Sequence, residues 1–409
     1  MNPDEKKSTA LIPVEGERLP AAPPVRRANY WGRISSRYTA LSRVMILLLL
    51  LFVVLFSLIF ARMFTYDSLF SFVKDIQNVS SFVPANYETV YATYDGADAA
   101  VTVYRGSIAF VTKGGVEVYA PDGTRLLNLD RELASPRVVA SEKYLIAYDQ
   151  GGKSFFVTNS YGELYSGESA FPILSATVAD SGYFALITTS DSYLSRVVLY
   201  DNNFNQIRGI NRGMATVGAV FLDDGSLALL GATAADGAIY TSLSIYDSKL
   251  ESVAYSCELE NEMPLALGLA DGTLMLLTDK ALHACDTDGS VKNSVTLEGA
   301  LVNFAFGREG AVLVSETDAV TATHRVVALN GDGVLVYDDV YNGDVYAVEV
   351  VDEALLLLCK NAVVRIPTDG SAVQTVAVEA GATDILSVGE RGLRVIYPAK
   401  AVFVDFEDS

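Results

Sequence analysis

The sequence predicts an all-β fold, an eight-bladed β-propeller, preceded by a single transmembrane helix. Three observations lead to this prediction. One uninterrupted apolar run lies near the N-terminus, short apolar strands follow from residue 99 onward, and two classes of turn recur between those strands with a common period. The segments that we expect are a disordered basic cytoplasmic tail at 1–42, the transmembrane helix at 43–62, a juxtamembrane amphipathic helix and linker at 63–86, and an extracytoplasmic propeller at 87–409.

The apolar run from Val44 to Ala61 reads VMILLLLLFVVLFSLIFA and contains no charge, glycine or proline. A helix of this length covers about 30 Å of hydrocarbon, and in lipid the backbone must satisfy its own hydrogen bonds. The residues after Phe60 form a poor signal-peptide cleavage site, and no cysteine lies nearby for lipidation, so we expect the helix to remain as an anchor. The anchor residues that we expect are Arg43, Val44, Leu50, Phe56, Ala61 and Arg62.

The charges that flank this helix predict its orientation. Eight basic residues precede it, whereas only Arg62 and Lys74 follow closely, so the positive-inside rule places the N-terminus in the cytoplasm and the rest of the chain outside. The tail before the helix is rich in proline and predicts disorder. Apolar residues at helical spacing then predict an amphipathic helix over 66–80.

A first class of turn separates a strand from a very hydrophobic strand in each repeat. Its second residues lie 37 to 47 residues apart, which is the period of a propeller blade. Pairs such as Asp-Gly suit hairpin turns, because those turns require positive φ. The turns of this class are Arg105-Gly106, Glu142-Lys143, Ser181-Gly182, Asp224-Gly225, Asp271-Gly272, Glu309-Gly310, Glu353-Ala354 and Arg391-Gly392.

A second class of turn repeats in step with the first. Each period therefore contains two hairpin turns and four strands, which make one blade. In the seventh period we expect strands at about 344–350, 354–359, 362–366 and 372–378. The turns of the second class are Pro121-Asp122-Gly123, Ser160-Tyr161-Gly162, Asn202-Asn203-Phe204, Ser248-Lys249-Leu250, Thr287-Asp288-Gly289, Gly331-Asp332-Gly333 and Thr368-Asp369-Gly370.

The number of blades follows from the incomplete last repeat. The eighth period ends at Ser409 without its outer strand, and the β-rich run Tyr87–Tyr94 precedes the first complete blade. Adding that run to the last blade closes the ring and removes an open sheet edge. The sequence therefore predicts eight blades, with a seven-bladed ring as the alternative.

These blades resemble the PQQ-like and YVTN/WD40-like propeller superfamily over residues 87–409, although the Trp-Asp and Gly-His signatures of WD40 repeats are absent. The whole layout, a basic tail, a Leu-rich anchor, a Phe-rich connector and an acidic propeller, resembles an uncharacterised family of membrane-anchored propellers from Gram-positive bacteria. The resemblance implies the fold and the location and implies no activity. The tryptophans and vicinal cysteines of quinoprotein dehydrogenases are missing, since Trp31 is the one tryptophan of the chain.

The uneven charge of the chain argues against some partners. Nine of its 30 Lys and Arg but only four of its 50 Asp and Glu lie in residues 1–62, so the remainder holds 21 basic and 46 acidic residues and has a net charge of −25. Phosphate binding depends on Lys and Arg, so we expect no nucleic-acid partner. The lipid bilayer is the expected partner of the anchor.

Motifs for catalysis are scarce. The two histidines, His283 and His324, fall in different repeats and cannot complete a zinc site, and Gly-x-Ser-x-Gly is absent. We expect no cofactor; if a metal binds, calcium at the acidic turns that hold Asp286 and Asp288, or at Asp95 and Asp98, is the candidate, although aspartate is also an ordinary turn residue.

Cysteine and tyrosine both have structural interpretations. Three scattered cysteines are interpreted as apolar fillers, with a Cys257–Cys285 bond as the exception. The abundant tyrosines could line a binding face, but many recur inside strands, where packing between blades explains them better. The residues of this kind are Tyr119, Tyr183, Tyr200, Tyr246 and Tyr337.

The function expected from these features is that of a scaffold. We expect a membrane-tethered extracytoplasmic interaction module that binds an envelope protein or a cell-wall glycan, in the cell membrane with the propeller outside. The alternative is an envelope enzyme that acts on a glycan through carboxylates in the propeller funnel. Convergent acids with raised pKa would favour the enzyme, and a broad apolar or Tyr-rich patch would favour the scaffold.

Overall fold

The chain divides into two units, Met1–Leu69 and Phe70–Ser409. The computed structural model describes Tyr38 and residues 41–52 of the first unit, and residues 89–92, 99–120, 123–159, 162–351, 353–388 and 392–406 of the second.

The described part of the first unit is helical. Tyr38 and residues 41–52 lie in helix, and their side chains are exposed. Among the residues that the structure describes, no helix is long and apolar enough to cross a membrane. The second half of the predicted span at 44–61 and the predicted helix at 66–80 lie outside the described residues.

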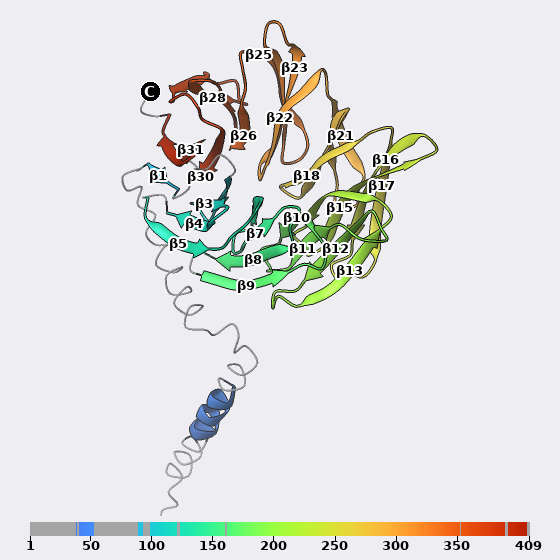
Figure 1. The fold of residues 1–409 in the computed structure, drawn as a ribbon, viewed down its shortest axis with the longest axis vertical. Helices are drawn as coiled ribbons and strands as arrows, with labels where there is room; N and C mark the ends of the chain where they lie inside the picture. Colours follow the sequence, from blue (N-terminus) through green and yellow to red (C-terminus); the bar gives the residue numbers. More distant parts are fainter. Residues whose placement is uncertain are drawn as a thin grey trace, which may run out of the picture. The chain divides into compact units, whose positions relative to one another are not determined.

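The second unit is a ring of eight antiparallel sheets of four strands each, arranged around a central axis (Figure 1). This confirms the prediction of eight blades and excludes the seven-bladed alternative. We number the blades in chain order and count the strands of each blade outward from the axis.

Blades 1 and 2 consist of β2 (Ala100–Tyr104), β3 (Ser107–Thr112), β4 (Gly115–Tyr119), β5 (Arg125–Asp130), β6 (Pro136–Ala140), β7 (Leu145–Asp149), β8 (Ser154–Asn159) and β9 (Gly162–Glu168). Blades 3 and 4 consist of β10 (Ile173–Val178), β11 (Phe184–Thr188), β12 (Ser195–Tyr200), β13 (Gln206–Arg212), β14 (Ala215–Phe221), β15 (Leu227–Ala235), β16 (Ala238–Tyr246) and β17 (Val253–Glu260). Blades 5 and 6 consist of β18 (Pro264–Ala270), β19 (Thr273–Thr278), β20 (Ala281–Cys285), β21 (Val291–Thr296), β22 (Ala300–Gly307), β23 (Gly310–Asp318), β24 (Thr323–Asn330) and β25 (Leu335–Asn342). Blades 7 and 8 consist of β26 (Ala347–Val351), β27 (Ala354–Leu358), β28 (Ala362–Pro367), β29 (Gln374–Ala377), β30 (Asp384–Val388), β31 (Gly392–Tyr397), β32 (Lys400–Val404) and β1 (Val90–Tyr91).

The two faces of the ring differ in what connects the strands. Because neighbouring strands are antiparallel, both predicted classes of turn, after the first and after the third strand, lie on one face, which we call the turn face. The turns after the second strand and the links between blades lie on the other face, which we call the connection face. Positive φ angles at Asp271 (42°) and Gly272 (79°) show why Asp-Gly suits the tight turns.

The core lies between neighbouring blades. The second strand of blade 7, β27, is buried throughout, because it packs on both sides. Leu355 and Leu357 belong to a cluster shared with blade 6, whereas Leu356 and Leu358 belong to a cluster shared with blade 8. Alternation of side chains along a strand explains this division, and it explains why the second strands read as continuous apolar runs.

The N-terminal strand closes the ring, as predicted. Strand β1 pairs with β32, with Val90 opposite Ala401, and so completes blade 8. Val90 is 2% exposed and packs in one cluster with Ile108 of blade 1 and Ile396 of blade 8. Pairing of the first strand with the last strand therefore closes the propeller, and each of the eight sheets has four strands.

Candidate functional site

A curved row of exposed apolar side chains lies on the connection face of blades 3 to 7, and we call it the apolar crescent. Large exposed apolar residues are common on protein surfaces singly, but a set on one face marks an interaction site. Exposure in this set ranges from 37% at Leu174 to 61% at Leu194. The members of the apolar crescent are Leu174, Tyr193, Leu194, Val217, Met263, Val302 and Tyr346.

Three members of the crescent are the extra residues of β-bulges. In each case the register between the first and second strands of a blade shifts by one residue near the connection face, at Leu174, at Val217 and at Val302. Blade 5 has the same shift at Leu265, which is half-buried. A bulge turns a side chain away from the alternating pattern, and bulges concentrate at functional sites. Blades 3 to 6 thus share the same β-bulge, and in each blade this bulge reorients an apolar side chain at the start of the innermost strand.

Hydrogen bonds hold two of these bulges in place. The Gln150 side chain donates from Nε2 to the carbonyl oxygen of Leu174 at 3.1 Å. At the next bulge, the Thr216 backbone N–H donates to Ser195 Oγ at 3.2 Å, and Ser195 Oγ in turn donates to the Met214 carbonyl at 2.8 Å. The strand starts that carry Leu174 and Val217 are therefore fixed rather than frayed.

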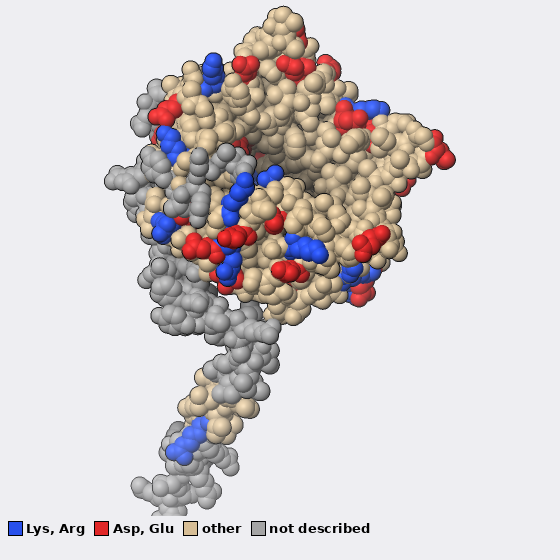
Figure 2. All heavy atoms as spheres, viewed as in Figure 1, with Lys and Arg blue, Asp and Glu red and all other residues tan. Residues whose placement is uncertain are grey.

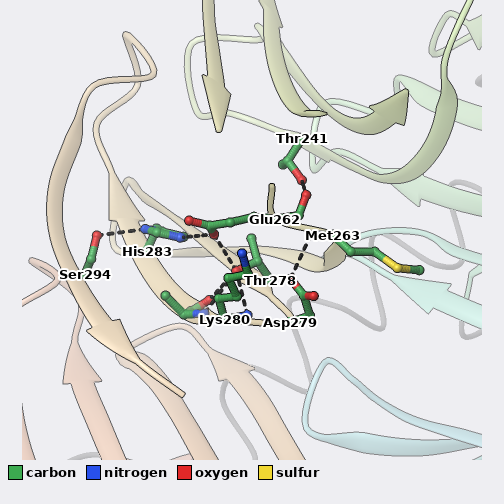
Figure 3. A network of polar contacts seen from close by, with 9 residues as sticks. Thr241, Glu262, Met263, Thr278, Asp279, Lys280, His283 and Ser294 are labelled. Carbon is green, nitrogen blue, oxygen red and sulfur yellow. Dashed lines mark hydrogen bonds and ion pairs between the residues drawn. The ribbon is translucent and has the colours of Figure 1, made fainter. Parts of the chain in front are cut away.

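A polar network at blade 5 holds the link that carries Met263 (Figure 3). One carboxylate oxygen of Glu262, Oε2, lies 2.8 Å from His283 Nε2 and accepts a 2.7 Å hydrogen bond from the Thr278 hydroxyl. The other ring nitrogen of His283, Nδ1, lies 2.7 Å from Ser294 Oγ. His283 is 6% exposed, so these bonds form in a largely dry environment, where they are strong.

Main-chain bonds join this network to Met263 itself. The Met263 N–H donates to Asp279 Oδ1 at 2.8 Å, and the Asp279 N–H donates back to the Met263 carbonyl at 2.9 Å. The Thr241 hydroxyl of blade 4 donates to the Glu262 carbonyl at 2.6 Å. Figure 3 shows these groups converging on the link between blades 4 and 5, which presents Met263 at 50% exposure.

The alignment of Ser294, His283 and Glu262 has the order of a nucleophile, a base and an acid, and its chemistry can be judged from the contacts. Both ring nitrogens of the buried His283 are occupied, and Ser294 lies on the outermost strand of the blade. Two cavities lined by described residues lie on the opposite face. The network therefore serves to hold the link, and it does not form a reaction site.

Tyr346 of the crescent is fixed from both sides. Its carbonyl oxygen accepts a 2.8 Å hydrogen bond from Asn303 Nδ2 of blade 6, and its N–H donates to the Leu358 carbonyl of blade 7 at 2.8 Å. The ring remains 47% exposed. Because the backbone of Tyr346 is fixed, binding of a partner to this ring costs little backbone entropy.

Charge divides the connection face into two halves. In the first half, the links and turns of blades 3 to 6, only Lys280 is basic, and six residues are acidic. The segments of this acidic half are 189–194, 213–214, 236–237, 261–263, 279–280, 297–299, 319–322 and 343–346. Its acidic residues are Asp191, Asp236, Glu262, Asp279, Glu298 and Asp344, and Glu260 ends the strand just before one of these links.

The second half, the described links and turns of blades 7, 8, 1 and 2, has the opposite balance. It holds four basic residues, Lys113, Arg131, Lys153 and Lys360, against Glu132 and Glu379. Figure 2 shows one face of the ring, with many of its Lys and Arg over the blades of β3 to β9, interspersed with Asp and Glu, and with mainly Asp and Glu among the charged residues over β16 to β25. The segments of this basic half are 113–114, 131–135, 150–153, 169–172, 359–361, 378–383 and 398–399.

The calcium candidates Asp286 and Asp288 lie in the turn between the third and fourth strands of blade 5. Asp286 Oδ1 accepts the Thr287 N–H at 2.9 Å, and Asp288 Oδ1 accepts the Ser290 N–H at 2.8 Å. Asp286 also lies 3.4 Å from Lys292 Nζ. Within the described residues no group of three or more His, Cys, Asp or Glu is placed to hold a metal. The other acidic pair, Asp95 and Asp98, lies outside the described residues.

One pair of carboxyl groups with raised pKa lies near the axis, on the innermost strands of blades 7 and 8. Burial and, to a smaller extent, the nearby Asp384 raise the pKa of Glu349 to about 8. Burial also raises the pKa of Asp384. Yet Glu349 Oε2 is buried and has no hydrogen-bond partner, so a substrate in the channel cannot reach this atom. Glu349 belongs to the packing between two blades.

Two adjoining cavities open on the turn face of blades 5 to 7. Their volumes are about 480 and 400 Å³, and they share Glu309 and Asn330. The first is lined by charged and amide side chains of turns, with Asp271 on one wall and Arg308 on the other. Asn330 Oδ1 is used within its own turn, where it accepts the Val334 N–H at 2.9 Å. These cavities are grooves between turns, without a buried polar group aimed into them.

The cysteines and the strand tyrosines have structural roles, as predicted. All three cysteines are free thiols, and Cys257 and Cys285 pack in one apolar cluster between blades 4 and 5. Burial raises the pKa of Cys285 to about 12. Each tyrosine named from the sequence packs in a cluster between neighbouring blades, as Tyr119 and Tyr200 illustrate at 8% and 6% exposure.

A second apolar stretch lies on the outer strand of blade 6. Val334, Leu335, Val336 and Val340 are 37% to 56% exposed there. This strand is interrupted by the charge of Asp338, which Arg325 pairs at 2.8 Å, and a charge on an edge strand discourages pairing with another chain.

The crescent residues were not among the residues expected from the sequence, but a signal for them exists. At the start of the innermost strand, two apolar residues follow each other in blades 3 and 6, as Ile173-Leu174 and Leu301-Val302. This doubling breaks the alternation of a half-buried strand, and a bulge restores the alternation after it. The same rule would have pointed to these bulges before the structure.

Comparisons with known proteins agree with this architecture. No curated protein matches the chain. Among solved structures, BamB from Moraxella catarrhalis is 14% identical, with a TM-score of 0.52, over 77% of this chain and 96% of that one. The C-terminal WD40 domain of Sif2 is 12% identical, with a TM-score of 0.54, over 77% and 99%. The WD40 domain of SCAP from fission yeast is 10% identical, with a TM-score of 0.51, over 78% and 96%.

At such identities these likenesses extend to the propeller fold alone. The family described as "Family of unknown function (DUF5711)" matches residues 79–405, which cover the whole ring. The chain therefore belongs to this DUF5711 family, and its fold is an eight-bladed β-propeller that resembles those of BamB and of WD40 proteins.

Proposed function

We propose that the chain is a membrane-tethered extracytoplasmic scaffold that binds a partner protein through the apolar crescent. The observation that carries this proposal is the crescent itself, seven exposed apolar residues on one face of five neighbouring blades. Propellers commonly serve as rigid interaction platforms, and the fold alone does not specify the activity.

The free energy gained by burying the crescent side chains favours binding of a partner protein. Burying one large apolar side chain contributes about 1.5 to 3 kcal/mol, and hydrogen bonds already fix the backbone at or beside Leu174, Val217, Met263 and Tyr346. A surface whose anchors are held before binding loses less entropy on association. A glycan ligand is less well supported, because saccharides stack on aromatic rings, and only Tyr193 and Tyr346 of the crescent are aromatic.

The tether is part of the proposal. Residues 44–61 are apolar, and the described part of that run is helical and exposed. With the positive-inside rule, the tail then lies in the cytoplasm and the propeller in the envelope, where the expected partner is an envelope protein.

Affinity capture from membranes tests this proposal. The full chain is compared with a version that keeps the anchor but lacks the propeller, and with the double variant Leu194→Ser/Tyr346→Ser. A matched control, Val334→Ser/Val373→Ser, removes equally exposed apolar residues from the turn face. One envelope protein that is captured by the full chain and the control, and lost with the crescent variant, is the expected result. Equal capture by both double variants would contradict it.

The raised pKa of Glu349 supports a second candidate, a glycan-active enzyme. A general acid for glycoside cleavage needs such a pKa and a partner carboxylate within roughly 5 to 9.5 Å. Against this stands the buried Oε2 atom, which a sugar cannot reach. Hydrolysis of cell-wall glycan by the full chain, abolished in Glu349→Gln, would favour the enzyme and displace the scaffold as the function.

A further inference from the structure

We infer that the segment that occupies the apolar crescent is cationic as well as apolar, a stretch of another protein in which Lys or Arg flank large apolar side chains. This inference rests on the proposed function and specifies its partner. It follows from the charges that accompany the crescent residues.

Three exposed carboxylates lie directly beside crescent residues in the chain. Asp191 precedes Tyr193 by two residues, Glu260 precedes Met263 by three, and Asp344 precedes Tyr346 by two. All three acids are exposed. An apolar anchor with an acid on the same short link offers a partner both an apolar contact and a negative charge.

Other acids of the same half already have cationic or N–H partners. Glu298 lies 3.4 Å from Arg325 Nη1, Glu262 bonds His283, and Asp279 accepts the Met263 N–H. These groups hold the structure, whereas the three carboxylates beside the anchors are left to face an incoming partner. The negative potential of this half is therefore directed at the site of binding.

Little positive charge opposes this potential. Arg212, the last residue of β13, is 5% exposed, and burial lowers its pKa. Lys280 is the one exposed cation of the segments that define the acidic half. An anionic segment, an anionic lipid surface or a nucleic acid would meet repulsion from the acids and gain almost no ion pair.

The basic half of the same face contributes to orientation. A segment with Lys or Arg is attracted to the links of blades 3 to 6 and repelled by Lys153 and Lys360 of the other half, where Arg131 is already paired with Glu163 at 2.9 Å. Complementary charges steer encounter and fix the register of binding more than they add affinity. The apolar crescent residues supply the affinity, and the unequal charge of the two halves determines where on the face the segment binds.

A pair of synthetic peptides tests this inference with the full chain in detergent. Each has about 18 residues, roughly 27 Å as a helix, with leucine on one face and either lysine or glutamate on the other. Fluorescence anisotropy at low salt is the measurement. The lysine peptide is expected to bind at least about tenfold more tightly than the glutamate peptide, and added salt is expected to weaken it.

Variants locate the effect. The triple variant Asp191→Asn/Glu260→Gln/Asp344→Asn is expected to lose about tenfold in affinity for the lysine peptide, as three exposed ion pairs of about 0.5 kcal/mol would. A matched triple variant, Asp223→Asn/Asp332→Asn/Glu353→Gln, removes three acids that are also exposed but lie on the turn face. This variant is expected to keep its affinity for the lysine peptide. Equal losses in both triples would overturn the inference, because net charge alone would then explain binding.

The outcomes separate this inference from the proposed function. If both peptides bind equally, or if neither binds, the cationic partner is overturned. Capture of an envelope protein that depends on Leu194 and Tyr346 would still uphold the crescent as the binding surface. If that capture also fails, the crescent itself is not the site, and the proposed function falls.

Discussion

The two halves of the connection face are built from the same repeat and differ in three ways. The inner strands of blades 3 to 6 carry bulges, whereas the described ladders of blades 1, 2, 7 and 8 run without a shift at this position. The bulged half is apolar and acidic at its surface, and the regular half is basic. The regular half also contains the seam at which β1 closes the ring.

The difference separates residues that hold the fold from residues that present a surface. At the seam, Val90 is 2% exposed and Arg394 is 1% exposed with its guanidinium 5.2 Å from the centre of the Phe403 ring. In the crescent, Leu194 and Met263 are half exposed or more, and they pack against little. Substitutions at the seam are therefore expected to change stability, and substitutions in the crescent are expected to change binding.

The largest effect is expected at the seam. Val90→Asp places an unpaired charge in the cluster of Ile108 and Ile396, and we expect a loss of about 4 kcal/mol or more in the free energy of unfolding. Val334→Asp, at a position that is 56% exposed, is the control and should cost less than about 0.5 kcal/mol. Urea unfolding measures both, and equal costs would show that β1 does not close the ring.

The next effect depends on pH and concerns Glu349, at the seam side of blade 7. Its folded-state pKa of about 8 lies above the unfolded value of about 4.3, so the folded chain binds more protons. The contribution of Glu349 to the stability of the protein should therefore be fully present below about pH 4 and be lost as the pH rises through 8.

Glu349→Gln removes this dependence. At pH 9 we expect the variant to be more stable than the natural chain by on the order of 3 kcal/mol, and at pH 4 to be equal. Thermal unfolding across this pH range is the measurement. A natural chain whose difference from the variant does not grow with pH would contradict the burial of this carboxyl group.

The polar network at blade 5 should have an intermediate effect. His283→Ala leaves Ser294 and one hydrogen bond of Glu262 without a partner, and we expect a loss of about 2 kcal/mol. His324→Leu is the matched control, because this buried histidine has an unsatisfied Nδ1, and its loss should cost less. If His324→Leu proves the more costly, the network is not what holds the Met263 link.

A smaller effect is expected at the turn once considered for calcium. Asp288→Ala removes the hydrogen bonds from the Ser290 side chain and from the Ser290 N–H, which lower the pKa of Asp288, and should cost about 0.5 to 1 kcal/mol. The melting temperature of the natural chain should not change when calcium is added or chelated. A rise with calcium that Asp286→Asn abolishes would make this turn a metal site after all.

The smallest effect on stability is expected in the crescent. Leu194→Ser, at a position that is 61% exposed, should change the free energy of unfolding by less than about 0.5 kcal/mol. The same variant should weaken capture of the partner. A large loss of stability would mean that Leu194 is a packing residue and not a binding residue.

The propeller could be predicted from the sequence because each repeat carries its own signals. Positive φ at Arg105 and Gly106 matches the turn expected there, and the strands 347–351 and 354–358 of blade 7 lie within a few residues of the expected 344–350 and 354–359. The closing strand at Val90–Tyr91 was predicted from an incomplete last repeat. Local turn chemistry and alternation decide all of these features.

The binding face could not be predicted, because it depends on how the blades meet. The bulge at Val217 changes the register by one residue without a doubled apolar pair in the sequence, and only the paired strand reveals it. The order of charge around the axis also requires the ring to be closed, since Asp191 and Asp344 lie far apart in the sequence. His283 was expected to be structural, and its contacts with Glu262 and Ser294 confirm this.

Site-specific photo-crosslinking in cells tests the crescent most directly. A photoreactive residue is placed singly at Leu194 and Tyr346 in the crescent, and at Val334 and Val373 on the turn face. The side chains at these four positions are 47% to 61% exposed. The account predicts that the two crescent positions capture the same envelope protein, through a peptide rich in Lys or Arg, and that the two turn-face positions do not. Capture of that protein from the turn face alone would contradict the account.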